Sequence, residues 1–131
     1  MVVEHFGVAN SDKVYKAGDT VTYVAEFKQD VDSRLAMTAW LDRIGGPDES
    51  GLTWEIYLQN SQHVGPRHIE VSGVMGGLAN GHYKPVRVDL NIGGVTKTLS
   101  TNLDPDGDAV ITVAGNTGPS FPELVDFDPK H

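Results

Sequence analysis

The sequence predicts an all-β fold, a β-sandwich of about seven or eight strands, and three observations support this prediction. Apolar and polar residues alternate with a period of two along most of the chain, as they do in strands with one buried face. Turn-forming residues interrupt the alternation at intervals of about 8–12 residues, which is the spacing of strands in sandwiches. Convincing 3.6-residue periodicity with capping residues is missing, so a long helix is not expected.

The expected strands share an apolar face made of alternate residues. They are 20–27, 34–41, 52–58, 67–75, 84–92, 95–101 and 108–114. In 52–58, Trp54 shares a face with Ile56 and Leu58, which is typical of a core tryptophan. In 84–92 the same alternation predicts that Val86 is buried together with Val88.

Gly, Pro, Asn and Asp fill the segments between these strands, where hairpins and corners need them. The expected turns are 16–19, 44–51, 76–81, 92–94 and 104–108. Because strand follows turn throughout, the chain is predicted to be all-β, with at most one turn of helix in 44–51.

The length of 131 residues predicts one domain, with a sandwich over 1–115 and an extended arm over 116–131. Alternation stops in the arm, and its three prolines cannot donate to a sheet ladder. Two interpretations stay open: a disordered tail, or an arm that docks on its own domain or on a neighbour. The second is suggested by apolar residues that are unusual in a free tail: Phe121, Leu124, Val125 and Phe127.

Composition excludes several classes of function. The net charge of -8 repels phosphate backbones and anionic membranes, so binding of nucleic acid or membrane is not expected. Cysteine is absent, which removes disulfides, thiolate metal sites and cysteine nucleophiles. Neither a signal-peptide pattern nor an apolar run of membrane-spanning length is found.

Residues 69–114 resemble a bacterial immunoglobulin-like domain of the invasin or carboxypeptidase-regulatory type. The resemblance is in the strand with Ile69, Val71 and Gly73, the segment "KPVRVDL", the hairpin "GGVTKTLST" and the closing stretch "DPDGDAVITV". The stretch "VYKAGDTVTYVAEF" (14–27) is similar to the first strands of such domains. The resemblance implies an immunoglobulin-like sandwich that serves as a spacer, an adhesion module or a virion decoration.

Asp104, Asp106 and Asp108 alternate in "DPDGD" and are candidate calcium ligands. They do not form an EF-hand loop, because the residue at the sixth position is Ala109 and the one at the twelfth is Gly115. A tight turn explains the stretch without a metal ion, with aspartates that accept backbone hydrogen bonds. The turn is the preferred interpretation, and calcium is the alternative.

Trp40 and Tyr57 are candidate ligand-binding residues, because sugars stack their apolar faces on exposed aromatic rings. The alternative is that the tryptophans belong to the core, since immunoglobulin-like sandwiches commonly bury one. The five histidines show no metal-binding or catalytic spacing, and no nucleophile motif is present.

These observations predict a protein that is not an enzyme and has no cofactor, with calcium the one candidate. We expect a structural or attachment module of a phage particle or bacterial surface, which acts through contacts with a protein partner or a second copy. Two alternatives stay open, a carbohydrate-binding sandwich and a calcium-rigidified adhesin repeat. The expected location is the virion, the extracellular space or the cell surface.

Overall fold

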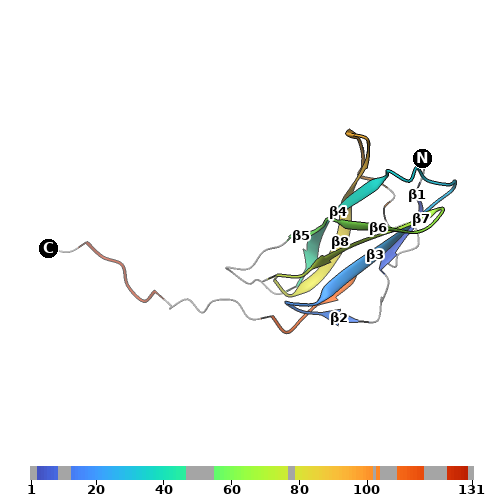
Figure 1. Cartoon of the computed structure of the whole chain (residues 1–131). Helices are drawn as coiled ribbons and strands as arrows, with labels where there is room; N and C mark the ends of the chain where they lie inside the picture. Colours follow the sequence, from blue (N-terminus) through green and yellow to red (C-terminus); the bar gives the residue numbers. More distant parts are fainter. Residues whose placement is uncertain are drawn as a thin grey trace.

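The computed structural model of the chain shows an all-β protein with two sheets (Figure 1). The structure describes residues 3–8, 13–46, 55–76, 79–101, 103, 109–116 and 124–129.

The first sheet has four antiparallel strands, and Figure 1 shows β3 beside β7 within it. Its order is β1 (Val3–Val8), β3 (Thr20–Phe27), β7 (His68–Val74) and β6 (Asn60–Gly65). The residues of β3 alternate between the core and the outer face over its whole length, as the period-two pattern predicts.

The second sheet has six strands. Along it lie β2 (Val14–Tyr15), β10 (Ile111–Val113), β8 (Gly81–Ile92), β4 (Ala36–Gly45) and β5 (Glu55–Leu58), and β9 (Val95–Leu99) also pairs with β8. The β2–β10 pair is parallel and the other pairs are antiparallel.

One of the two sheets curls into a half-barrel. Bulges bend strands and increase their twist, and the β4–β8 pair of the second sheet contains two register shifts, after Trp40 and after Arg43. Opposite the first shift, β8 has an extra residue between its paired residues Pro85 and Arg87. The prediction that Val86 is buried with Val88 is therefore wrong: the bulge buries Pro85 and leaves Val86 half-buried.

The inner faces of both sheets share one hydrophobic core, and no polar or charged residue among the described ones is buried in it. Phe6 and Tyr23 pack edge to face with ring centroids 5.0 Å apart. The hydroxyl groups of two fully buried tyrosines are bonded: Tyr23 donates to the carbonyl oxygen of Ala109, and Tyr83 to that of Ala79 at 2.5 Å.

Ten strands are present among the described residues, more than the seven or eight expected. The additional ones include β1 and β6, which the alternation did not indicate. In β6 no residue is buried, so its sequence carries no apolar face. The turn expected at 44–51 starts later, because β4 continues to Gly45. Trp54, predicted in the core, lies outside the described residues.

Candidate functional site

Three side chains form a row across the outer face of the six-stranded sheet. Tyr57 of β5 and Arg87 of β8 are the register partners of Trp40, which lies between them on β4. The rings of Trp40 and Tyr57 are stacked, with centroids 4.9 Å apart and an interplanar angle of 30°. The guanidinium carbon of Arg87 lies 4.5 Å from the centroid of the Trp40 ring, a cation–π distance.

Asp89 holds Arg87 in this row. The guanidinium group donates to it from Nε at 3.0 Å and from Nη2 at 2.9 Å, and Thr98 of β9 donates to the same carboxylate at 2.8 Å. The hydrogen bonds from Arg87 lower the pKa of Asp89, and the bond from Thr98 acts in the same direction against the effect of partial burial. The carboxylate therefore stays ionised and keeps Arg87 over the indole.

The contacts in this row determine which of the two aromatic rings a ligand can reach. Tyr57 and Arg87 come from opposite sides of β4, so they cover both faces of the Trp40 indole. Tyr57 lies on β5, which is an edge strand of the six-stranded sheet, and its side chain is 45% exposed. The structure thus brings together the two aromatic residues that the sequence singled out, with Tyr57 rather than Trp40 available to a ligand; their binding role stays a prediction.

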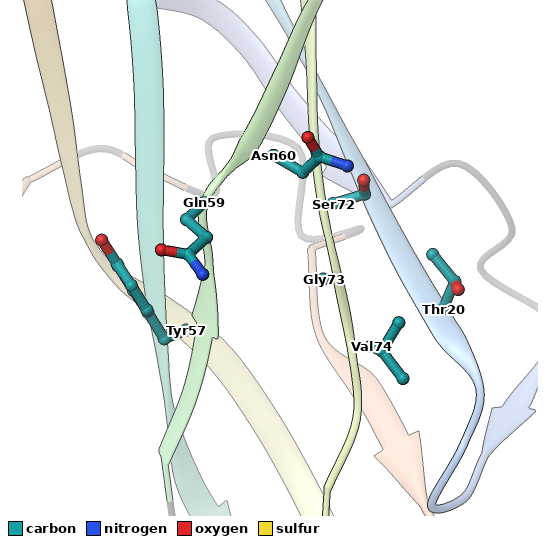
Figure 2. Close-up of a pocket in the computed structure, with 7 residues that line it drawn as sticks. All are labelled: Thr20, Tyr57, Gln59, Asn60, Ser72, Gly73 and Val74. Atoms are coloured by element: carbon teal, nitrogen blue, oxygen red, sulfur yellow. The ribbon is translucent and has the colours of Figure 1, made fainter.

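A groove lies next to Tyr57, where the chain crosses from one sheet to the other (Figure 2). Strand β5 belongs to the six-stranded sheet and β6 to the four-stranded one, and Gln59 is the residue between them. The groove has a volume of about 680 Å³. It is lined by Thr20, Tyr57, Gln59, Asn60, Ser72, Gly73 and Val74.

Gly73 allows the crossing to pass close to β7. A Cβ atom at this position would lie 3.0 Å from Leu58 Cδ2 and 3.0 Å from the carbonyl oxygen of Tyr57. Since real Cβ contacts are rarely so short, a side chain here would push β5 and Tyr57 away. The sequence analysis used Gly73 only as part of a strand motif and did not identify the groove.

The C-terminal arm exposes apolar side chains. Leu124 is 72% exposed, Val125 94% and Phe127 88%, and Figure 1 shows this segment extending away from the two sheets. Phe121, the fourth apolar residue singled out in the arm, lies outside the described residues. Scattered exposed apolar residues are ordinary, but three within four positions form an apolar segment.

A second hollow lies beside the β8–β9 hairpin. It has a volume of about 130 Å³ and is lined by Leu35, Leu90, Ile92, Val95 and Lys97. The hairpin turns at Gly93 and Gly94, whose φ values of 57° and 88° suit a tight two-residue turn. The sequence indicated the hairpin, but not that Leu35, the residue before β4, would lie beside it.

Metal binding is not tested by the structure. Asp104, Asp106 and Asp108 lie outside the described residues, so the calcium interpretation and the turn interpretation both stay predictions. Within the described ranges, no group of three or more His, Asp or Glu side chains could hold a metal ion. No helix among the described residues is long and apolar enough to cross a membrane.

The three histidines whose side chains are described bond to separate partners. His68 contacts Glu26 at 3.1 Å, His63 contacts the carbonyl oxygen of Leu35 at 2.8 Å, and His82 contacts Thr112 at 3.1 Å. Each contact joins a different pair of strands or loops, so these three residues form no common cluster.

Comparison with known proteins identifies no family for this chain. No family model and no curated protein matches the chain. The features that bear on its function are therefore the arm, the hairpin hollow and the groove.

Proposed function

We propose that this protein is a non-enzymatic, immunoglobulin-like attachment module that joins its neighbours through its C-terminal arm. The observation that carries the proposal is the run of exposed apolar side chains at Leu124, Val125 and Phe127. An apolar segment in water is stabilised when a partner buries it, so such segments commonly mark interaction sites.

The strand order supports the immunoglobulin-like part of the proposal. With β2 and β9 left out and the other eight strands lettered in chain order as A, B, C, C′, D, E, F and G, β1-β3-β7-β6 follows the A-B-E-D order of that fold, and β10-β8-β4-β5 follows G-F-C-C′. Tyr83 lies near the start of β8, the equivalent of strand F, and donates to the carbonyl oxygen of Ala79 four residues upstream. A tyrosine at this corner is a recurrent feature of immunoglobulin-like sandwiches.

We propose that the arm's partner is a second copy of this chain, at the hollow beside the β8–β9 hairpin. The hollow is walled by the apolar residues Leu35, Leu90, Ile92 and Val95, and its volume of about 130 Å³ suits a single apolar side chain. Charge also matches: Lys97 lies at the hollow, whereas Asp126 and Asp128 alternate with the apolar residues of the arm.

The energetics predict a weak contact between two isolated copies. Burying one large apolar side chain yields about 1.5–3 kcal/mol, whereas association costs about 4–15 kcal/mol in lost freedom. Three such side chains yield about 4.5–9 kcal/mol, so against the lower end of that cost about 4–5 kcal/mol remains at most, which corresponds to a dissociation constant on the order of 1 mM. The contact therefore becomes strong only where many copies are held together, as on a virion or a cell surface, which are the locations we propose.

The test is the mass of the full chain in solution as a function of concentration, measured by sedimentation from about 10 μM to about 1 mM. We expect the mass to rise above that of the monomer. Replacing Leu124, Val125 and Phe127 together with Ser should abolish the rise.

Two single variants locate the receiving surface. Val95→Asp, at the hollow, should prevent association, whereas Val14→Asp should not, because Val14 is exposed on β2 outside the hollow. A chain that stays monomeric at all concentrations would contradict the proposal of a second copy. Association that persists in the triple Ser variant would contradict the role of the arm.

A further inference from the structure

We infer that the groove at the crossing between β5 and β6 binds a short, uncharged oligosaccharide. This is a binding site separate from the arm and the hairpin hollow, and it does not depend on the proposed attachment function. The inference uses Tyr57 as a stacking surface but not Trp40, whose two faces are already covered.

The lining has the chemistry that recognises sugars. Thr20 and Ser72 supply hydroxyl groups, and Gln59 and Asn60 supply amides, each of which can both donate and accept hydrogen bonds. Sugar hydroxyls do the same, so these groups are complementary to a saccharide ring. In Figure 2, Gln59 lies on the same side of Gly73 as Tyr57, and Asn60 lies above Gly73. Thr20 and Val74 lie on the opposite side.

These polar groups are available to a ligand. No hydrogen bond within the described part of the chain engages the side chains of Thr20, Gln59, Asn60 or Ser72. Tyr57 and Asn60 lie on consecutive strands joined by a single residue, so their relative positions are set by the backbone. A ligand would therefore replace water at these groups without breaking contacts inside the protein.

Tyr57 is held ready for stacking. One of its faces packs on Trp40, which is itself held by Arg87 and, through Arg87, by Asp89. A ring fixed in this way loses little conformational freedom when a ligand binds, which lowers the entropic cost of binding. Aromatic rings stack on the apolar faces of sugars while neighbouring polar groups fix the orientation.

The charges of the groove select an uncharged ligand. None of its lining residues is an acid or a cation, although the whole chain has a net charge of -8. An anionic glycan would enter an acidic protein without a cation to pair with, and a cationic ligand would find no carboxylate in the lining. The volume of about 680 Å³ lies within the range of about 300–1,000 Å³ found for small-molecule sites.

The test is binding of the full chain to four neutral hexasaccharides, namely cellohexaose, maltohexaose, mannohexaose and N-acetylchitohexaose, with a heparin hexasaccharide as the anionic comparison. Titration calorimetry should give a dissociation constant of about 0.1–1 mM for at least one neutral hexasaccharide. Tyr57→Ala and Asn60→Ala should each weaken that binding at least tenfold. Gln62→Ala should not, because Gln62 is exposed on the same strand as Asn60 but does not line the groove.

Each outcome decides the inference. No binding by any of the four sugars, tighter binding of the heparin fragment, or binding unchanged by both groove substitutions would overturn it. If Tyr57→Ala fails to fold, Asn60→Ala and Gln59→Ala test the groove in its place, because both substitutions change exposed side chains. The triple Ser variant of the arm should bind the sugar normally, which separates failure of this inference from failure of the attachment proposal.

Discussion

Substitution of Tyr83 by Phe tests whether the corner between β7 and β8 stabilises the fold. The change removes one hydroxyl group, which donates to the carbonyl oxygen of Ala79 at 2.5 Å. Both residues are fully buried. Because the ring itself stays, the packing of the core is unchanged apart from one oxygen atom.

The expected loss of stability comes from the carbonyl group of Ala79, which loses its hydrogen-bond donor. A typical intramolecular hydrogen bond contributes about 0.5–1.5 kcal/mol, but leaving a buried acceptor without its partner costs about 1–3 kcal/mol. Since water has no access to a fully buried Ala79, we expect a loss of about 1–3 kcal/mol in the free energy of unfolding. The measurement is urea unfolding followed by tryptophan fluorescence, with the slope m compared between variants.

Tyr57→Phe is the matched control. It makes the same chemical change at a tyrosine that is 45% exposed, and whose hydroxyl group takes part in no hydrogen bond within the described residues. Its effect should stay within about 0.5 kcal/mol of zero. Equal stability losses for the two variants, or no loss for Tyr83→Phe, would refute the reasoning about the corner.

Two further predictions concern calcium and acid. If "DPDGD" is a turn, as we expect, the melting temperature is the same in millimolar calcium as in a chelator. A ligand that binds only the folded state raises its stability. A higher melting temperature in calcium, abolished by Asp106→Ala, would therefore establish a metal site. The second prediction rests on hydrogen bonds from Arg34, which lower the pKa of Asp32 to about 2. A carboxyl group with a lowered folded pKa contributes stability that is complete above its unfolded pKa of about 3.9 and is lost as the pH falls through the folded value. Urea midpoints should therefore fall between about pH 4 and about pH 2, less steeply in Asp32→Asn and less steeply in high salt, because this pair is exposed and screened. Identical acid profiles for Asp32→Asn and the unsubstituted chain would show that the Arg34 contact has no such effect.

The sequence predicted the strands whose residues alternate between core and solvent. In β3 every second residue is buried, and these are the residues that the alternation in the sequence places on one face. The sequence could not predict β6, because none of its residues is buried and its pairing with β7 is made by backbone groups. Nor could it predict the bulge in β8, where Pro85 rather than Val86 is buried, since a bulge shifts the register by one residue without changing local composition.

The candidate site was predictable only in part. Trp40 and Tyr57 stand out in the sequence as aromatic residues on the faces opposite the apolar ones, and the register of β4 and β5 places them side by side. The rest of the groove comes from β3, β7 and the β5–β6 crossing, which are distant in the chain. No local pattern joins Thr20 to Asn60 or Ser72, so these residues come together only once β3, β7 and β6 are paired in the four-stranded sheet.

The proposed arm contact also determines the shape of any assembly. The arm and the hairpin hollow are different surfaces, so a one-way contact leaves a free arm at one end of each complex and a free hollow at the other. Such a contact continues into a ring or a filament, whereas reciprocal exchange of arms between two copies closes into a dimer. The mass measured at rising concentration distinguishes these cases, because a dimer reaches a plateau and a filament does not. A plateau at two chains would therefore indicate a closed attachment unit, and continued growth would indicate a module that polymerises along a surface.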